Sequence, residues 1–379
     1  MCKRPAISFM LIVCWLALTA GGVAAGPDYA PIMPRAAQSL LLDIAAAGSR
    51  LVAVGERGHI LYSDDDGRNW RQARVPTTQM LTSVCFVDAG HGWAAGHDGI
   101  ILATDDAGET WRLQRNGIAA QEQANLEQRE VALREVQRLE QAVAAAPPRE
   151  RGALESALED ALLDLEDAEL VLEEPPFASP LMDIWFQDRD RGWAVGAFGT
   201  LVKSNDGGRH WVSTPGAVPN PEELHLNTVT GDGTGRVFIA GEEGLMFRSL
   251  DAGRHWESVQ SDYQGSWFGA LYNRSRDALL VFGLQGQLHR SDDFGERWHA
   301  LASDTQMTLN GGSAAADGQV VIVGAVGTVL HSIDGGEPFT MHTLPQRLSL
   351  SAGLQRGGEL VLAGQGGVRR MALSGDDND

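Results

Sequence analysis

The sequence predicts an all-β fold, a seven-bladed β-propeller with Asp-box repeats and one inserted antiparallel α-helical hairpin. Three observations predict it. An eight-residue box recurs six times, and a Gly-x-x-Gly turn precedes each box at a fixed distance. The ordinary units repeat about every 42 residues, which is the length of a four-stranded propeller blade. Glycine is enriched to 45 of 379 residues without a Gly-X-Y period, which favours turn-dense β structure over collagen.

The box reads Ser or Thr, any residue, Asp, any residue, Gly, two of any residue, then an aromatic residue, and it begins at positions 63, 104, 204, 249, 291 and 332. Its aspartate can accept backbone N–H bonds, its glycine can adopt a positive φ, and its aromatic ring can cover the neighbouring core. We therefore predict a structural role for the aspartate and the aromatic residue of each box: Asp65, Trp70, Asp106, Trp111, Asp206, Trp211, Asp251, Trp256, Asp293, Trp298, Asp334 and Phe339.

The Gly-x-x-Gly turns begin at glycines 55, 96, 196, 241, 283, 324 and 364, so there is a seventh turn without a box behind it. The interval between the turns at 96 and 196 is the one that exceeds the repeat length, and we interpret the extra residues as an insertion. In the second unit, strands are expected at 81–86, 92–95 and 100–103, with a fourth beginning at Trp111. The turn then joins the second and third strands, and the box joins the third and fourth.

The chain divides into 1–25, a signal peptide; 26–117, blades 1 and 2; 118–179, the helical insertion; 180–373, blades 3 to 7; and 374–379, an acidic tail. The seventh unit supplies three strands before the sequence ends. We expect the stretch 28–36 to supply the fourth strand of that blade and so close the ring.

The N-terminal segment has the features of a secretory signal. Lys3 and Arg4 precede an apolar run at 6–20, and Val23-Ala24-Ala25 is a small-residue site with cleavage expected after Ala25. This predicts a periplasmic or secreted protein. A retained membrane anchor is the alternative, because the apolar run is nearly long enough to span a bilayer.

The insertion is predicted to be an antiparallel helical hairpin. Leu154, Leu158, Ala161, Leu165, Ala168 and Leu172 follow heptad spacing, and so do Ala132, Val136, Leu139 and Val143. Residues 118–179 carry 15 acidic and 5 basic residues, a net of −10 out of the −20 of the whole chain. Topology places the hairpin on the face of the Gly-x-x-Gly turns. There it is either a partner-binding element or a solvated decoration.

Residues 92–111 (GWAAGHDGIILATDDAGETW) and 192–208 (GWAVGAFGTLVKSNDGG) resemble the signature of the photosystem II stability/assembly factor family, and the resemblance extends from about 40 to 370 outside the insertion. It implies a secreted, cofactor-free propeller that assists assembly of a membrane complex. Photosynthetic members bind a reaction-centre subunit. Copies in non-photosynthetic bacteria resemble envelope accessory proteins, in some cases of efflux-type transporters.

The binding surface is expected on the Gly-x-x-Gly loops, with candidate residues Glu56, Arg57, His97, Asp98, Phe198, Glu242, Glu243 and Gln285. Only Arg57 among these is basic, which departs from the arginine-rich client surface of photosynthetic members. The expected partner is a membrane protein complex or an envelope transporter.

Other classes fit less well. A net charge of −20 disfavours nucleic acid as a partner. No metal-ligand spacing, cofactor motif or catalytic arrangement is recognisable, so no catalytic residue is assigned. Asp boxes also occur in sialidases and other glycoside hydrolases. The alternative function is therefore a glycoside hydrolase or a glycan-binding protein. Such hydrolysis needs two carboxylates at a fixed distance, or a tyrosine nucleophile with an acid and an arginine cluster, and Pro34-Arg35 does not match the Arg-Ile-Pro opening of sialidases.

Overall fold

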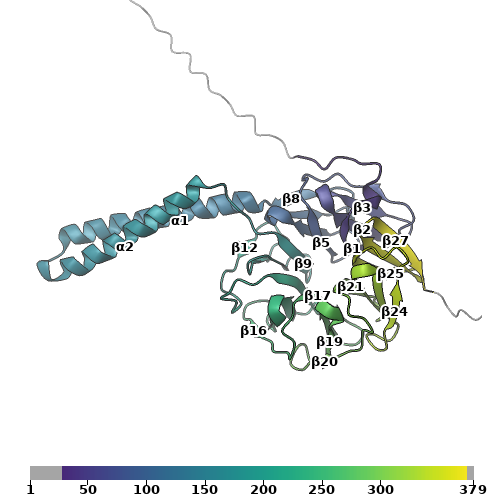
Figure 1. Cartoon of the computed structure of the whole chain (residues 1–379). Coiled ribbons are helices and arrows are strands. Elements are labelled where there is room, and N and C mark those ends of the chain that lie inside the picture. Colours follow the sequence, from purple (N-terminus) through teal and green to yellow (C-terminus); the bar gives the residue numbers. More distant parts are fainter. Residues whose placement is uncertain (1–27, 374–379) are drawn as a thin grey trace, which may run out of the picture.

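Seven antiparallel sheets form a ring around a central channel, and a pair of helices extends from it (Figure 1). The computed structural model describes residues 28–373, so the expected signal peptide and acidic tail lie outside the described residues. Six sheets have four strands and the seventh has three, each in chain order from the channel outward. The predicted seven-bladed propeller is confirmed.

The strands of blades 1 to 4 are β1 (Leu41–Ala47), β2 (Arg50–Gly55), β3 (Ile60–Ser63) and β4 (Arg71–Gln72); β5 (Leu81–Phe86), β6 (Gly92–Gly96), β7 (Ile101–Thr104) and β8 (Arg112–Arg115); β9 (Leu181–Phe186), β10 (Gly192–Gly196), β11 (Leu201–Ser204) and β12 (Val212–Ser213); and β13 (Leu226–Gly231), β14 (Val237–Gly241), β15 (Met246–Ser249) and β16 (Glu257–Ser258).

The strands of blades 5 to 7 are β17 (Trp267–Asn273), β18 (Ala278–Gly283), β19 (Leu288–Ser291) and β20 (His299–Ala300); β21 (Leu309–Ala314), β22 (Val320–Gly324), β23 (Thr328–Ser332) and β24 (Thr340–Thr343); and β25 (Leu350–Arg356), β26 (Glu359–Gly364) and β27 (Gly367–Ala372). In every blade the Gly-x-x-Gly turn joins the second and third strands. The boxes join the third and fourth strands of blades 1 to 6, as predicted.

The hydrophobic core lies between neighbouring blades. Val52 and Ile60 of blade 1 pack with Leu81 and Trp111 of blade 2, and the same kind of cluster recurs at each blade junction. The second strand of each blade is buried almost throughout, because both of its faces meet an adjacent blade. Apolar burial is therefore spread evenly around the ring.

The boxes are held by a repeated set of hydrogen bonds. In the third box the Ser204 hydroxyl donates to Asp206 Oδ1 (2.9 Å) and accepts from Gly208 N (2.8 Å). His210 N, four residues after the aspartate, donates to Asp206 Oδ1 (2.9 Å), and His210 Nδ1 lies 2.6 Å from Oδ2. These bonds lower the pKa of Asp206 to about 2. Asp65, Asp106, Asp251 and Asp293 accept the corresponding backbone bond.

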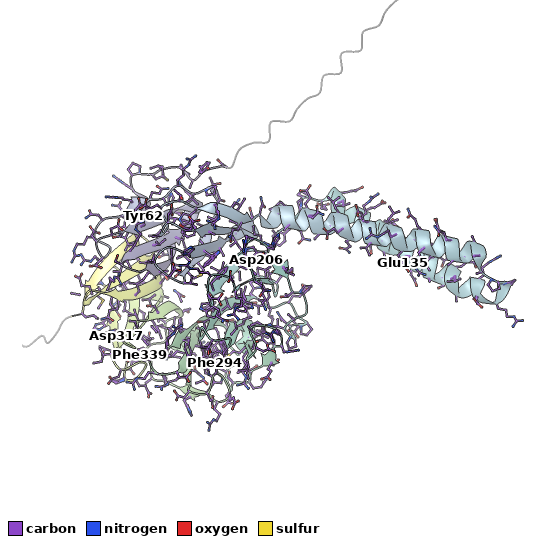
Figure 2. The ribbon with its side chains drawn as sticks, turned by 180° about the vertical axis from the view of Figure 1, so that it is seen from behind. Tyr62, Glu135, Asp206, Phe294, Asp317 and Phe339 are labelled. Carbon is purple, nitrogen blue, oxygen red and sulfur yellow. The ribbon has the colours of Figure 1, made fainter. Side chains whose placement is uncertain are left out.

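The sixth box departs from this pattern. The residue four positions after Asp334 is Pro338, which has no N–H to donate to the carboxylate. Asp334 is exposed, and its Oδ1 lies 3.9 Å from Arg276 Nη2. Of the usual bonds, the one from Gly336 N to the Ser332 hydroxyl remains (3.1 Å). Phe339 completes the box and packs against the core of blades 5 and 6 (Figure 2).

The expected N-terminal closing strand is wrong. Residues 28–36 form no strand of the seventh blade, which has three strands within the described chain. Instead Ala30 N donates to Val75 O (2.9 Å), so the stretch runs along the outer edge of blade 1. Pro31 and Pro34 explain this, because they interrupt the N–H donors that a ladder requires.

Ring closure between blades 7 and 1 is achieved by packing. Ala36 begins the short helix η1 (Ala36–Gln38) and is buried beside Leu41 and Val361, with Val368 packed on the same cluster. The Arg356 side chain of blade 7 donates to Gly48 O of blade 1 (2.7 Å). Apolar contact and this polar link hold the blades together where strand pairing was expected.

The insertion forms the predicted hairpin of α1 (Gly117–Ala145) and α2 (Pro148–Glu173). Val136, Leu139 and Ala161 are buried between the helices, as the heptads predict, and Arg129 Nη2 lies 3.1 Å from Glu169 Oε1 across them. Gly117 lies against Asp98 and Gly99, so the root is on the expected face. The hairpin extends sideways beyond the rim rather than over the ring (Figures 1 and 2).

No helix within residues 28–373 is long and apolar enough to cross a membrane.

The boxes offer a matched pair of mutations for stability. We expect Asp206→Ala to lower the free energy of unfolding by about 1–2 kcal/mol at pH 7, because the N–H of His210 loses its acceptor. Asp334→Ala should change it by less than about 0.5 kcal/mol, because its carboxylate holds no turn. Urea unfolding followed by tryptophan fluorescence measures both. An equal loss in the two variants would contradict the assigned bonds.

Candidate functional site

The turn face is the face of the ring that carries the seven Gly-x-x-Gly turns. In each turn the N–H of the second residue donates to the carbonyl that precedes the blade's first strand, as in Glu56 N to Leu40 O (3.1 Å) and Ala197 N to Pro180 O (3.0 Å). In blades 1 to 6 the third residue then has a left-handed backbone, with φ between 51° and 58°, at Arg57, Asp98, Phe198, Glu243, Gln285 and Val326.

The first glycine of the turn is required by a close approach. A Cβ atom at Gly55, Gly96 or Gly196 would lie 2.1 Å from the carbonyl oxygen before the first strand, which no side chain tolerates. The turn is therefore held against the start of its blade. In blades 1 to 6 the left-handed residue is exposed in five of the six turns and half-buried at Asp98.

The structure distributes the predicted binding residues unevenly. Arg57, Phe198, Glu243 and Gln285 are exposed, and His97 and Asp98 are half-buried. Two glutamates serve the ring itself, because Glu56 Oε1 accepts from Leu40 N (3.2 Å) and Glu242 Oε2 accepts from His225 N (2.9 Å). The predicted residues thus lie on separate blades around the turn face and do not converge on one pocket.

One cluster on the turn face contains residues that the sequence did not single out. The Phe198 ring lies 6.0 Å from the Phe177 ring, edge to face, and 5.1 Å from the His225 ring. Phe177 comes from the segment that returns from the hairpin, and His225 precedes β13. Phe177 follows Pro175 and Pro176, which mark a helix end, but no local pattern indicates that its ring meets Phe198.

A second cluster, made of polar residues, lines the channel on the first strands of blades 1 to 4. Asp43 Oδ2 accepts from Val84 N of the next blade (2.8 Å), and Asp183 Oδ2 accepts from Val229 N of the next blade (2.8 Å). Ser83 lies between the two carboxyl groups. These bonds join neighbouring blades at the wall of a channel of about 320 Å³.

The two carboxyl groups share one hydroxyl. Ser83 Oγ lies 2.7 Å from Asp183 Oδ1 and 3.2 Å from Asp43 Oδ2, and a hydroxyl donates to only one of them. Burial, together with the nearby charge of Asp183, raises the pKa of Asp43 to about 7, and burial also raises the pKa of Asp183. A protonated Asp43 that donates to Ser83 completes the chain of hydrogen bonds to Asp183.

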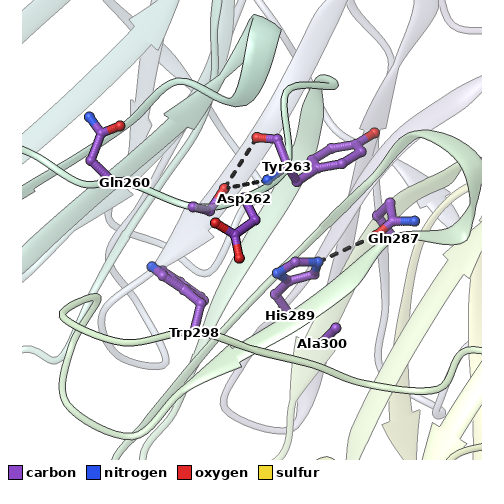
Figure 3. A pocket seen from close by; sticks show the side chains of 8 residues that line it. Gln260, Asp262, Tyr263, Gln287, His289, Trp298 and Ala300 are labelled. Carbon is purple, nitrogen blue, oxygen red and sulfur yellow. Dashed lines mark hydrogen bonds between the residues drawn. The ribbon is translucent and has the colours of Figure 1, made fainter.

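A pocket of about 400 Å³ opens between blades 4 and 5 (Figure 3). It is lined by Gln260, Ser261, Asp262, Tyr263, Gln287, His289, Trp298 and Ala300. Burial lowers the pKa of His289, so its ring is neutral at neutral pH, and its Nε2 lies 3.3 Å from Gln287 Oε1. Asp262 supplies the one carboxylate of the lining, whereas glycoside hydrolysis commonly needs two.

A tyrosine nucleophile is also disfavoured where a tyrosine, an acid and an arginine do meet. Tyr272 Oη donates to Asp277 Oδ1 (2.5 Å), and Arg236 Nη2 lies 3.2 Å from the same hydroxyl. Burial and the bond to Asp277 raise the pKa of Tyr272 to about 12. A nucleophilic tyrosine must lose its proton, and these surroundings stabilise the protonated form.

No group of three or more His, Cys, Asp or Glu side chains in the described part of the chain is arranged to hold a metal ion.

The chain matches the sequence family described as photosynthesis system II assembly factor YCF48 over residues 63–139 and 168–379. No curated protein sequence matches it significantly.

Solved propellers superimpose on nearly the whole chain. A YCF48 bound to a D1 peptide is 15% identical, with a TM-score of 0.58 over 93% of this chain and 97% of that one. YCF48 from Cyanidioschyzon merolae is 15% identical, with a TM-score of 0.57 over 92% and 99%. The WD40 propeller domain of Doa1 is 11% identical, with a TM-score of 0.58 over 92% and 97%. At these identities the likeness concerns the fold.

The channel carboxyls predict a pH dependence of stability. Because the pKa of Asp43 is raised, the folded ring holds a proton that the unfolded chain lacks between about pH 4 and pH 7. Stability should therefore fall across this window as pH rises, by at most about 4 kcal/mol. Asp43→Asn should make the curve shallower, because the amide does not titrate in this range. Urea unfolding from pH 4 to pH 8 tests this, and an unchanged curve in the variant would contradict the shared proton.

Proposed function

The chain belongs to the family of the photosynthesis system II assembly factor YCF48, and from this we propose that it is a non-enzymatic scaffold that binds a membrane protein complex and assists its assembly or operation. The observation that carries the proposal is the turn face. It presents left-handed loop residues of mixed chemistry, five of the six exposed, on the ring, which suits protein binding. The related YCF48 solved with a D1 peptide supports a peptide segment as the bound element.

We also propose that this scaffold acts outside the cytoplasmic membrane, and that its client is a membrane protein complex such as an envelope transporter. The basic and apolar N-terminal sequence and the cleavage site after Ala25 support export. The turn face supports a client other than the photosystem, because Arg57 is its one basic left-handed residue. The acidic hairpin beside this face takes part in binding.

The glycoside hydrolase alternative has less support. The pocket beside His289 has one carboxylate, and Tyr272 is held in its protonated form. The two carboxyl groups in the channel, Asp43 and Asp183, are each engaged by Ser83 and by a backbone N–H of the next blade. A glycan-cleaving activity that copurifies with the intact chain and resists further purification would favour it.

Blade 6 offers a matched pair of positions for cross-linking. Val326 on the turn face and Ile333 in the sixth box flank the same strand, β23, at opposite faces, and both are exposed. With a photoreactive benzoylphenylalanine at each position in turn, we expect an integral membrane protein to cross-link in native envelopes from position 326 and not from 333. Mass spectrometry of the adducts identifies the client. Adducts of equal yield from both positions, or none containing a membrane protein, would contradict the scaffold.

The hairpin can be shortened without disturbing its root. Removing residues 133–164 and joining the ends by a short Gly/Asn turn keeps Ala132, Leu165 and the Arg129–Glu169 pair. We expect the ring to unfold as before, because the helices pack on each other, while the yield of the client adduct from position 326 falls severalfold. An unchanged yield would show that the hairpin is a solvated decoration.

A further inference from the structure

Two exposed phenylalanines meet at the root of the hairpin. The Phe177 side chain is 63% exposed and that of Phe198 is 52% exposed, and their rings lie 6.0 Å apart at 73°. His225 packs on Phe198 from the other side, 5.1 Å between ring centres, and its Nδ1 lies 3.4 Å from Glu242 Oε2. We call Phe177, Phe198 and His225 the aromatic patch.

The turn accounts for the left-handed backbone at position 198 but not for an exposed phenylalanine there. The φ of 54° at Phe198 is left-handed, a conformation that is unfavourable for a bulky side chain, and the equivalent residue of the seventh turn is Gly366. About half of the Phe198 side chain is exposed, and two exposed aromatic rings side by side are typical of a protein contact site.

The surroundings of the patch are acidic. Six glutamates occur in the segments that carry or adjoin it: Glu173, Glu174, Glu222, Glu223, Glu242 and Glu243. In those segments, 173–180, 196–200, 219–225 and 241–244, there is no lysine or arginine, and His225 is the one ionisable nitrogen. Glu223 is close to the turn itself, because its Cα lies 3.7 Å from where a Cβ would stand on Gly199.

A cavity beside Phe198 can receive a side chain. It measures about 210 Å³ and is lined in part by Leu201, Pro215 and Val218. Aromatic faces within an acidic rim attract lysine and arginine, and a recess with both aliphatic and polar residues in its wall next to them can hold an anchor side chain. Anionic lipid and nucleic acid are disfavoured here, because the rim carries charge of the same sign.

We propose that the aromatic patch is the docking site for a basic segment of the client protein that also carries an apolar anchor residue. The basic side chains lie over Phe177 and Phe198 and pair with the surrounding glutamates, and the anchor enters the cavity at Val218. This deepens the proposed function, since it rests on a protein client and specifies the chemistry of the segment that is bound.

A peptide titration on the full mature chain tests the docking site. The probe is a short fluorescein-labelled peptide of lysine, phenylalanine, glycine and serine, and its binding is followed by anisotropy. We expect Phe198→Gly and Phe177→Ala each to raise the Kd about tenfold or more. Ile333→Ala, at an exposed apolar residue on the opposite face of the ring, should leave it unchanged. Added salt should weaken binding to the wild type.

Two control peptides and one stability measurement separate specific binding from loss of folding. A peptide with glutamate in place of lysine should not bind, and one with alanine in place of phenylalanine should bind more weakly. Phe198→Gly removes backbone strain, so the variant should unfold no earlier than the wild type, and Phe177→Ala tests the same site from another segment. The docking site is refuted if neither substitution alters the Kd, or if the glutamate peptide binds equally well.

Cross-linking from position 326 separates this inference from the proposed function. If the wild type captures a membrane protein and Phe198→Gly captures it equally well, the client binds elsewhere and only the docking site is refuted. If the wild type captures no membrane protein, the scaffold proposal fails, whatever the peptide titration shows.

Discussion

The arrangement of the ring depends on one repeated contact, between the first glycine of each Gly-x-x-Gly turn and the carbonyl before the first strand of the same blade. At Gly55 and Gly196 a Cβ would lie 2.1 Å from that oxygen, so the position excludes every residue with a side chain. The contact holds the end of the second strand, at the turn face, against the start of the first strand, which lines the channel. The left-handed residue lies two positions after this glycine, and at Phe198 about half of its side chain is exposed on the turn face.

The ring contains a locally unfavourable feature, the two carboxyl groups of Asp43 and Asp183 in the channel. Two acids near each other in a partly dehydrated channel disfavour their charged forms, yet each accepts a backbone N–H from the following blade. Those N–H groups would otherwise lack a partner, and an unpaired buried donor costs about 1–3 kcal/mol. Sharing one proton through Ser83 removes most of the repulsion and keeps both links between blades.

The sequence predicts features of this fold whose cause is local. Gly96 and Asp106 mark a turn and a box wherever they recur, because backbone conformation and near-neighbour bonds require them. The closing strand at 28–36 could not be judged in this way, since its pairing depends on an edge distant in sequence. The channel position of Asp43 was equally hidden. A β-bulge between Leu41 and Asp43 shifts the alternation of side chains between the two faces of the strand, so the face on which Asp43 lies cannot be predicted from sequence spacing.

Distance limits what the acidic hairpin can do for the ring. Its longer helix of 29 residues extends about 43 Å at 1.5 Å per residue, whereas charges in physiological salt are screened within about 8 Å. Charge near the tip therefore cannot guide a ligand to the aromatic patch, and the six glutamates at the root must supply the local field. The outer part of the hairpin acts only on whatever lies beyond the rim. A client that uses both surfaces must be large enough to contact them at once.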